Sequence, residues 1–578
     1  MKRILSVFIL ALSPCLFAQQ VVLEDREPEA ATGFDNKTSV STKEFMVVAA
    51  NPYASWAGKN IIERGGSAID AAIAVQAMLS LVEPQSSGIG GGAFIMYWDN
   101  TQKRLFTYDG REVAGEKATS DMFMVDGKPM SWRDAVVGGK SVGVPGVMKA
   151  LEMAHNAHGT LEWKDLFDDT IKQADDGFEV SPRLARLLSL DYHPGLNEFP
   201  LSSTYFKPGG ESLKAGFIRK NPALAESLRQ IAKEGADYLY TGKLAKQIVD
   251  TVNTAKINPG SLTLSDFSNY EAIKRSPLCG KYMTYKVCGM APPSSGGVSV
   301  LQILKGLENK GLDKYGAQSA EFAHLFAQSS ALAFADREEY IADLDFLGIS
   351  PVPLVNSRYL NERAKQVQLS NKWEEAEAGL PYQNVAYAQD DAYELNSTSH
   401  ISIIDKAGNA ISMTTSVEFM FGSGLMVGGF MLNNQLTDFA LSPSRDGKQV
   451  LNAVAAKKRP RSSMSPTIVF DQDNKVHLVV GSPGGSRIIN YVAQTIVNVL
   501  AFEMDVQEAI SAPRISNRNG YTALEKGTSL AAIKPALEAK GHEVRLVDLN
   551  SGIHAIHVDN GTLKGGADPR REGVAVGQ

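Results

Sequence analysis

The sequence predicts a mixed α+β protein in which helices pack on the outside of β-sheets. Three observations support this prediction. Residues 145–390 carry mostly helical patterns, with amphipathic stretches at 145–156, 221–233 and 318–340. Beyond residue 398 the pattern changes to short strands separated by turns. The sequence shows no repeat of fixed period, which argues against a solenoid or a propeller.

The composition is that of an ordinary folded protein. Of the 578 residues, 44% are hydrophobic and 21% are charged, which excludes a disordered or collagen-like chain. The length gives a soft expectation of about four domains, although large enzymes often form a single unit. The net charge of −6 supplies no basic field, so we expect no nucleic-acid partner.

The N-terminus has the pattern of a secretory signal peptide. The basic run Met1–Arg3 precedes the apolar run Ile4–Leu12, and a small residue stands at Ala18. We expect residues 1–18 to be removed, and residues 19–44 to form a flexible leader. The apolar run is too short for a membrane anchor. The sequence therefore predicts a periplasmic or secreted protein without a membrane anchor.

Local signals predict the elements that begin the globular part. An apolar run indicates a strand at Met46–Val48, and two glycines end the helix that follows it. A second, almost wholly apolar helix leads through the loop Glu83–Gly92 into another strand. These elements are expected at Ala54–Glu63 (helix), Ala68–Leu81 (helix) and Ala93–Trp98 (strand).

The last third reads as hairpins followed by a helix. Two β-rich runs, His400–Ile404 and Ala410–Thr415, are joined by a turn sequence that contains Gly408 and Asn409. Further elements are expected at Thr467–Phe470 (strand), Val476–Val480 (strand) and 488–502 (helix).

Two cysteines remain in the expected mature chain. Cys279 and Cys288 flank a stretch that reads as strand, turn and strand. A disulfide across this hairpin and a pair of free thiols are both compatible with the pattern. Two isolated cysteines do not make a metal site.

Three further motifs suggest chemistry but have better structural interpretations. Gly88–Ala93 has the spacing of a dinucleotide-binding loop, yet a helix precedes it and a strand follows, so we expect a tight buried turn. Ser141 lies in a G-x-S-x-G motif that could combine with His542, His554 or His557, but the nearby Pro145 favours a structural turn. His155 and His158 lack a third ligand, so no metal site is expected.

The most informative motifs of the remaining sequence combine hydroxyl groups, glycines and arginines. Asn396–His400 places hydroxyl groups at a loop-to-strand junction, and Gly481–Arg487 is a glycine turn that can aim N–H groups at an oxyanion. Arg459–Pro466 offers paired hydroxyl groups before a strand. Asp109–Glu112 places an arginine where it can clamp a carboxylate.

At these residues the sequence resembles the gamma-glutamyltranspeptidase family of secreted N-terminal nucleophile amidohydrolases. The resemblance spans residues 45–575, and several ordered motifs carry it. These are Glu83–Gly92, Thr398-Ser399-His400, Asn433-Asn434-Gln435, Ser462-Ser463, Gly484-Gly485 and Gly566–Arg571.

The resemblance implies a precursor that cleaves itself. The Thr398 hydroxyl would attack the carbonyl of Ser397, and hydrolysis of the ester would free the α-amine of Thr398. That amine titrates near about 7.7–8.0 and can act as general base for its own hydroxyl, so no cofactor is implied. A helix-rich fragment, 45–397, and a small fragment, 398–578, would together form one catalytic unit, a four-layer αββα sandwich of the N-terminal nucleophile hydrolase type.

The resemblance also assigns binding roles for a γ-glutamyl donor such as glutathione. Gly484 and Gly485 would hold the oxyanion, and Ser416 would support the nucleophile. The donor's α-carboxylate would bind Arg111, Ser462 and Ser463, and its α-ammonium would bind Asp438 and Gln435. The acceptor would be water, an amino acid or a peptide.

Departures from the family pattern leave alternatives open. Glu418 stands where many members have an asparagine that touches the donor's amino group, and as a second carboxylate near Asp438 it should still bind the ammonium. Arg461 stands where several members have an apolar residue, and the segment 439–461 is a short lid without tyrosine. A more open site can admit bulkier acyl groups. A cephalosporin or glutaryl acylase of the same fold is therefore the alternative enzyme. A non-enzymatic exported binding protein is the third hypothesis.

Overall fold

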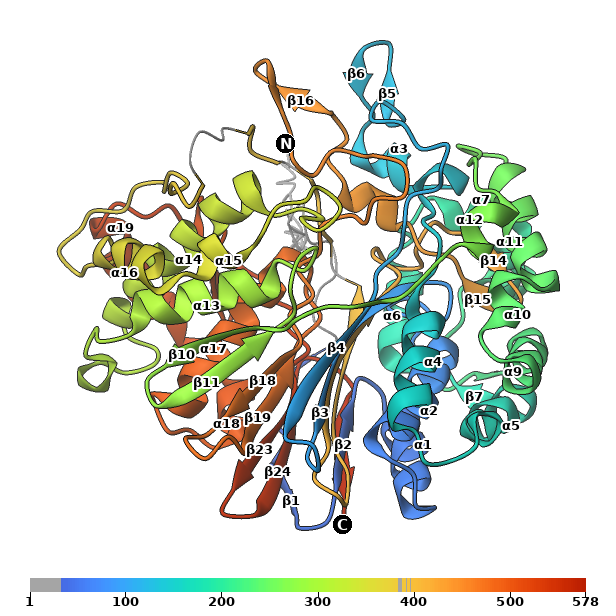
Figure 1. Cartoon of the computed structure of the whole chain (residues 1–578), viewed down its shortest axis with the longest axis horizontal. Coiled ribbons are helices and arrows are strands. Elements are labelled where there is room, and N and C mark those ends of the chain that lie inside the picture. Colours follow the sequence, from blue (N-terminus) through green and yellow to red (C-terminus); the bar gives the residue numbers. More distant parts are fainter. Residues whose placement is uncertain (1–32, 383–386, 391, 396) are drawn as a thin grey trace, which may run out of the picture.

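The computed structural model describes residues 33–382, 387–390, 392–395 and 397–578. The expected signal peptide, 1–18, and residues 19–32 of the leader lie outside the described residues. Two large antiparallel sheets lie face to face in the centre of the molecule, with helices on the outer side of each (Figure 1). This arrangement confirms the predicted mixed α+β class with helices outside the sheets.

Sheet I contains the strands nearest to the candidate site. Its hydrogen-bonded order is β25-β2-β12-β13-β3-β4-β9, and every neighbouring pair is antiparallel. The strands are β2 (Met46–Ala49), β3 (Gly92–Asp99), β4 (Arg104–Gly110), β9 (Ile273–Lys274), β12 (Thr398–Ile404), β13 (Ala410–Ser416) and β25 (Val574–Gly577).

The register of the β12–β13 hairpin decides which residues meet at its open end. The Asp405 carboxylate accepts hydrogen bonds from the N–H groups of Ala407 and Asn409, and Gly408 has φ of 79°. The pairing then runs without a bulge from Ile404 opposite Ala410 to Thr398 opposite Ser416. The turn chemistry thereby places Thr398 beside Ser416.

Sheet II lies against the inner face of sheet I. Its order is β1-β24-β23-β19-β18-β11-β10, again antiparallel throughout. A disulfide joins Cys279 to Cys288, which face each other across the β10–β11 hairpin. The strands are β1 (Val40–Thr42), β10 (Leu278–Tyr282), β11 (Tyr285–Gly289), β18 (Thr467–Phe470), β19 (Val476–Gly481), β23 (His554–Asp559) and β24 (Thr562–Ala567).

Three hydrophobic layers hold the sheets and helices together. In β2, Val47 and Ala49 face the helices, whereas Met46 and Val48 face sheet II, as the period-two geometry of a strand requires. Helices on the sheet I side are α1 (Pro52–Glu63), α2 (Ala68–Val82), α4 (Val147–His158), α5 (Asp168–Asp176), α6 (Pro182–Ser189), α9 (Pro222–Glu234), α10 (Asp237–Tyr240) and α11 (Lys243–Asn253). Those on the sheet II side are α13 (Gly296–Leu307), α14 (Ala320–Tyr340), α16 (Ser357–Lys365), α17 (Ile488–Leu500), α18 (Val506–Ser511) and α19 (Lys534–Ala539).

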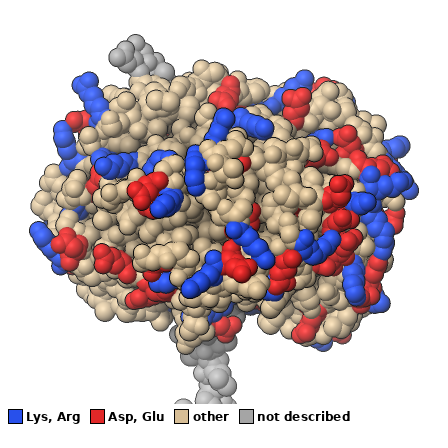
Figure 2. Space-filling view, turned by 60° about the horizontal axis from the view of Figure 1, so that its bottom comes forward, with Lys and Arg blue, Asp and Glu red and all other residues tan. Residues whose placement is uncertain are grey.

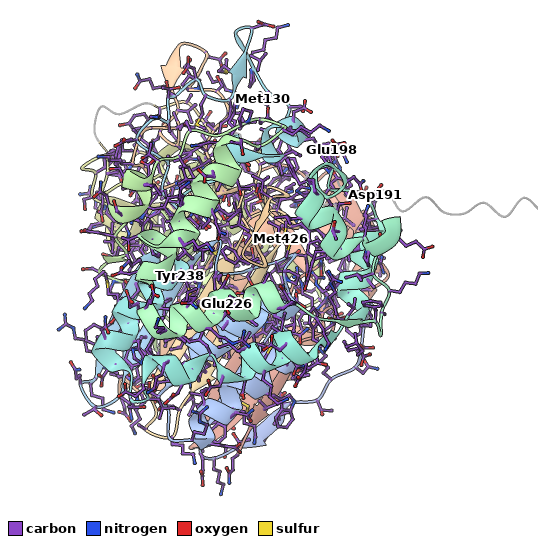
Figure 3. All side chains as sticks on the ribbon, turned by 90° about the vertical axis from the view of Figure 1, so that its right-hand side faces the viewer. Met130, Asp191, Glu198, Glu226, Tyr238 and Met426 are labelled. Carbon is purple, nitrogen blue, oxygen red and sulfur yellow. A yellow bond between two sulfur atoms is a disulfide. The ribbon has the colours of Figure 1, made fainter. Side chains whose placement is uncertain are left out.

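The helical layer on the sheet I side is shown from outside in Figure 3. Met426 lies in β14 (Met426–Val427), which pairs with β15 (Phe430–Met431), and it is surrounded in this view by helices. Glu226 on α9 and Tyr238 on α10 mark two of these helices. On the face drawn in Figure 2, basic and acidic side chains are interspersed, so this face offers no broad single-sign patch for a polyanion.

The expectation of a flexible leader at 19–44 is wrong for residues 33–44. β1 pairs with β24, and the ammonium group of Lys37 donates to the carbonyl oxygens of Asp568, Arg571 and Gly573 at 2.7–2.9 Å. A single lysine satisfies the three carbonyls, a long-range contact that local composition does not reveal. Across the described ranges, no helix combines the length and apolar character needed to cross a bilayer.

Candidate functional site

A cavity of about 20 Å³ lies beside Thr398 at the open end of the β12–β13 hairpin. Its lining contains every residue that the sequence assigned to catalysis or donor binding, apart from Gly484. These are Arg111, Thr398, Ser416, Glu418, Gln435, Asp438, Ser462, Ser463 and Gly485, joined by Glu394, Leu395, Met464 and Ile488. Segments more than three hundred residues apart in sequence thus meet at one point.

Ser416 connects the Thr398 hydroxyl to the carbonyl of the preceding residue. Thr398 Oγ1 donates to Ser416 Oγ at 3.2 Å, and Ser416 Oγ donates to the Ser397 carbonyl oxygen at 2.9 Å. The N–H of Glu418 also donates to Ser416 Oγ, at 2.8 Å. The hydroxyl of Ser397 donates to the carbonyl of Gln85 in the loop that precedes β3. The hydrogen bond from Ser416 therefore polarises the carbonyl of the peptide bond between Ser397 and Thr398, and the same serine holds the Thr398 hydroxyl beside this bond.

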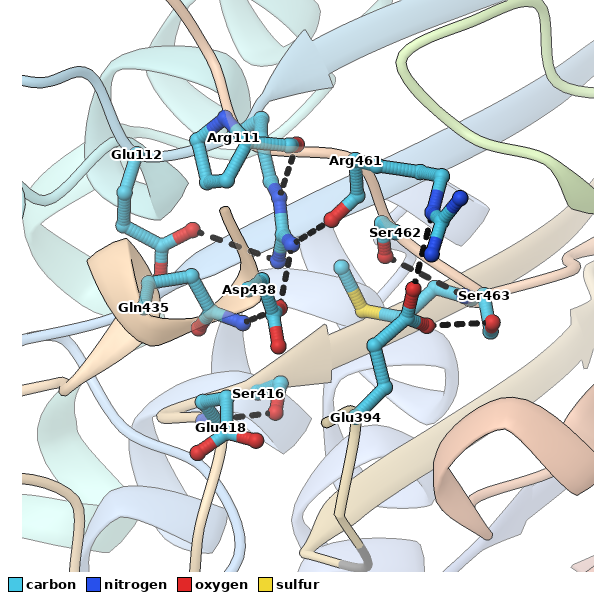
Figure 4. Close-up of polar contacts among 12 residues, drawn as sticks. Arg111, Glu112, Glu394, Ser416, Glu418, Gln435, Asp438, Arg461, Ser462 and Ser463 are labelled. Atoms are coloured by element: carbon cyan, nitrogen blue, oxygen red, sulfur yellow. Dashed lines mark hydrogen bonds and ion pairs between the residues drawn. The ribbon is translucent and has the colours of Figure 1, made fainter. Parts of the chain in front are cut away.

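Arg111 and Asp438 form the buried charged part of the cavity (Figure 4). Arg111 follows β4, and its Nη2 donates to Asp438 Oδ2 and to the carbonyl of Arg461, both at 2.5 Å. Gln435 Nε2 donates to the same Asp438 oxygen at 2.7 Å. Among the described residues, Asp438 Oδ1 and Gln435 Oε1 have no hydrogen-bond donor, although both atoms are buried. Two acceptors are thus left unsatisfied beside a guanidinium group.

Three buried carboxyl groups near this arginine have raised pKa values. Burial raises the pKa of Asp438 to about 6, although Arg111 acts in the opposite direction. Burial raises the pKa of Glu112, whose carboxylate lies 3.6 Å from Arg111 Nη1, to about 8. Burial, reinforced by the nearby charge of Asp438, raises the pKa of Glu418 well above its usual range.

Glu418 links the residues on both sides of the cavity. Its carboxylate accepts hydrogen bonds from the Leu395 N–H, at 3.2 Å, and from the Asn434 side chain. Its backbone has φ of 79°, a left-handed conformation that is uncommon for a residue with a side chain. This conformation directs its N–H to Ser416 and its carboxylate to Leu395, so the strain is located where the two contacts are needed.

The segment just before Thr398 fills the remaining part of the site. The Glu394 carboxylate contacts the Ser463 hydroxyl, Arg337 and Arg461, and the two arginines outweigh burial and hold its pKa at about 2. Arg337 Nη2 also donates to Ser463 Oγ at 2.7 Å, and Arg461 pairs with Asp390 at 3.0 Å. The position beside Ser463 therefore accepts a carboxylate, which in this chain belongs to Glu394.

Sequence reasoning missed Glu394 and Arg337. For Glu394, the one signal in the sequence is its position, four residues before Thr398 at the expected cleavage site. Arg337 lies in α14, where a charge on an amphipathic helix is ordinarily a solvated residue, but here it is 2% exposed. Arg461, which stands where several family members have an apolar residue, is fully buried and anchors the segment that fills the site.

The glycine pair follows the end of β19 and leads into α17. Gly484 and Gly485 have φ of 135° and 55°, and a Cβ on Gly484 would lie 2.6 Å from the ring of Tyr491. Gly485 begins the short 3-10 turn Gly485–Arg487 immediately before α17. The positive end of the α17 dipole therefore lies at the same position as this turn, which favours negative charge there.

The competing motifs have structural roles. Ser141 is buried, and its hydroxyl donates to the carbonyls of Val136 at 2.7 Å and Gly138 at 3.1 Å. Gly88–Gly91 completes the expected tight, buried connection between α2 and β3, and Gly92 and Ala93 begin β3. His158 is hydrogen-bonded to the Tyr108 hydroxyl at 2.7 Å, and the described residues contain no cluster of three potential metal ligands.

The fold consists of two stacked antiparallel sheets with a buried site at the start of a central strand. A solved acylase has the same fold, which defines the class of protein as an enzyme of this fold. The chain superposes on cephalosporin acylase from Bacillus halodurans with a TM-score of 0.82 at 26% identity, covering 95% of this chain and 98% of that chain. The chain belongs to the gamma-glutamyltranspeptidase family, whose sequence model matches residues 54–578. The resemblance seen in the sequence is thereby confirmed.

Curated relatives cover almost the whole chain. The glutathione hydrolase proenzyme of Bacillus subtilis (strain 168) is 37% identical over 595 residues, covering 100% of this chain and 99% of the relative. The glutathione hydrolase proenzyme of Escherichia coli (strain K12) is 37% identical, covering 92% and 91%. The Acylase ACY 1 proenzyme of Pseudomonas sp. (strain SE83) is 33% identical, covering 95% and 96%.

Proposed function

We propose that the chain is the precursor of an N-terminal threonine hydrolase that cleaves itself between Ser397 and Thr398. Thr398 Oγ1 attacks the Ser397 carbonyl carbon, the C–N bond breaks, and the Thr398 nitrogen takes up the proton. Water then hydrolyses the ester, which leaves a Ser397 carboxylate and a Thr398 with a free α-amine. The hydrogen-bonded series from Thr398 through Ser416 to the Ser397 carbonyl supports this step.

In the cleaved protein, Thr398 would act on γ-glutamyl amides such as glutathione. Its α-amine removes the proton of the hydroxyl, which attacks the γ-carbonyl carbon of the donor and forms a γ-glutamyl ester. The N–H groups of Gly484 and Gly485 are proposed to stabilise the oxyanion, and the proton then passes to the leaving amine. Hydrolysis of this ester by water releases glutamate. When an amino acid or a peptide attacks the ester in place of water, the glutamyl group is transferred to it.

One observation carries the choice of a γ-glutamyl donor. Asp438 Oδ1 and Gln435 Oε1 are buried acceptors without a donor, next to the guanidinium group of Arg111. An α-ammonium group would satisfy the two acceptors, and the neighbouring α-carboxylate would bind Arg111 with Ser462 and Ser463. A glutaryl group has no ammonium and would leave both acceptors unsatisfied, at a cost of about 1–3 kcal/mol each.

Access to the site requires a rearrangement after cleavage. The cavity of about 20 Å³ has room for little more than one water molecule. Glu394 and Leu395 line it, and Glu394 holds the Ser463 hydroxyl. Cleavage would free Ser397 as the new end of the large fragment. A donor would then enter after the residues that precede Ser397 have moved out of the cavity.

The test compares the purified protein with its Thr398→Ala variant by denaturing intact mass and N-terminal sequencing. Two wild-type fragments, the smaller one beginning Thr-Ser-His, with an intact variant chain, are the expected result. A well-folded wild-type chain that remains uncleaved would overturn the mechanism and return weight to a binding role.

A glutaryl acylase of the same fold is the second candidate, favoured by the likeness to the cephalosporin acylase and to Acylase ACY 1. Hydrolysis rates of γ-glutamyl and glutaryl anilides by the cleaved protein distinguish the two. We expect the γ-glutamyl anilide to be cleaved at least about tenfold faster, which corresponds to one unsatisfied buried acceptor. Equal rates, or a preference for the glutaryl anilide, would favour the acylase.

A further inference from the structure

A second, larger hollow lies next to the loop that carries the glycine pair. Its volume is about 460 Å³, and we call it the arginine pocket because three guanidinium groups line it. Among its described lining residues, Glu375 is the single carboxylate. The lining consists of Glu375, Tyr393, Arg487, Ser516, Arg518, Asn519, Gly520, Tyr521, Ala523 and Arg545.

Two chain segments connect the arginine pocket to the cavity beside Thr398. Gly485 lines that cavity, and Arg487, two residues later, lines the arginine pocket. In the uncleaved chain a second segment also joins them, because Leu395 lines the cavity and Tyr393 lines the pocket. Ser486 lies between the two on the first segment and accepts a hydrogen bond from Arg518 Nη1 at 2.7 Å. The pocket therefore begins within two residues of the proposed oxyanion site.

Aromatic and hydroxyl groups orient the guanidinium groups of this pocket. The buried Arg487 donates from Nη2 to the Tyr521 hydroxyl at 3.0 Å, and the Arg545 guanidinium lies 4.0 Å from the centre of the Tyr521 ring. Arg545 also pairs with Glu543 at 2.7 Å on the surface. Arginines held in this way bind carboxylates through paired hydrogen bonds with little further loss of side-chain freedom.

We propose that the arginine pocket binds the carboxylate of the peptide attached to the γ-glutamyl group, and later that of the acceptor. This inference rests on the proposed function, in which the glutamyl part fills the cavity beside Thr398. The reacting carbon then lies at Gly484 and Gly485, so the amine side of the amide emerges near Arg487 and Arg518. A leaving peptide that ends in a carboxylate is the ligand class that three guanidinium groups select.

The test uses two γ-glutamyl anilide donors that differ by one carboxylate on the ring of the leaving group. We expect Arg518→Gln and Arg545→Gln to raise the ratio of the carboxylated donor's KM to the neutral donor's KM by about five- to tenfold, as loss of a charge-assisted hydrogen bond predicts. The matched control is Arg229→Gln, an exposed arginine on α9 outside both hollows, which should keep the wild-type ratio. Denaturing gels verify that each variant is cleaved.

The outcomes separate the pocket from the proposed function. An unchanged KM ratio in both variants, with an active wild-type enzyme, would overturn the pocket and leave the proposed function intact. A wild-type enzyme that is cleaved but hydrolyses neither donor would overturn the γ-glutamyl activity, and the pocket with it. Higher salt should also reduce the preference of the wild-type enzyme for the carboxylated donor, because ions screen the arginines.

Discussion

At the scale of single residues, some side chains of the site contact the groups that react, and others are placed to bind a substrate. Ser416 touches the groups that react, because its hydroxyl contacts both Thr398 and the Ser397 carbonyl. Asp438 touches none of them and instead offers a buried oxygen to a cation. A change at Ser416 should therefore affect cleavage of the chain, whereas a change at Asp438 should affect how a substrate binds.

The raised pKa of Asp438 predicts that the plot of log kcat/KM against pH for the cleaved enzyme becomes steeper at its acidic end. An α-amine that titrates at about 7.7–8.0 must be neutral to act as base, so log kcat/KM should fall with slope one below that pH. Asp438 has its pKa at about 6 and must be ionised to attract the donor ammonium. Below about pH 6 the slope should therefore approach two.

The measurement is kcat/KM for a γ-glutamyl anilide in wild type and Asp438→Asn between about pH 4.5 and 9, a range that begins about 1.5 units below the pKa of Asp438 and ends about 1 unit above that of the α-amine. The variant should have a lower plateau and should keep a slope of one down to the acidic end. A slope of two that persists in Asp438→Asn would assign the second proton to another group, such as Glu418.

At the scale of elements, the loop between α2 and β3 sets the position of the hairpin end. A Cβ on Gly91 would lie 2.1 Å from the carbonyl oxygen of Ser416, and one on Gly90 would lie 2.2 Å from that of Met431. These neighbours are backbone atoms and cannot turn away as a side chain can. The glycines of this motif are therefore needed for close packing against the site, not for a phosphate.

Gly91→Ala should consequently displace Ser416 and strongly reduce cleavage of the chain. Gly88→Ala is the matched control, because its added Cβ would meet its nearest neighbour, Ser80 Oγ, at an ordinary 3.8 Å. The fraction of cleaved chain on denaturing gels and the melting temperature report the result. If both variants are cleaved like the wild type, the close contact with Ser416 does not control the chemistry.

How far the sequence could predict the molecule depends on the range of the contacts involved. Alternating and helical patterns placed β12, β13, α14 and α17 to within a few residues, because these patterns are local. Glu394 and Arg337 were missed because their contact joins residues 57 positions apart, and neither sequence environment indicates a buried ion pair. The leader was misjudged for the same reason, since Lys37 finds its carbonyls more than five hundred residues away.

At the scale of the whole molecule, both sheets are made from both sides of the proposed cleavage site. In sheet I, β2 lies between β25 and β12, and the β12–β13 hairpin lies between β2 and β3. In sheet II, β1 and β11 flank a block of four strands from the C-terminal part. In the part of the chain that the structure describes, five ladders therefore join residues before Ser397 to residues after it. Cutting one peptide bond removes none of these ladders.

The two fragments should therefore remain one particle after cleavage. We expect the cleaved protein and the uncleaved Thr398→Ala variant to elute at the same volume in size-exclusion chromatography, with both fragments in equal amounts. Separation requires the central ladders of both sheets to break together with three hydrophobic layers, so it should occur only in denaturant and in one cooperative transition with loss of activity. Release of either fragment on simple dilution would contradict this interleaved arrangement, because strands in the middle of a sheet cannot leave while their neighbours stay folded.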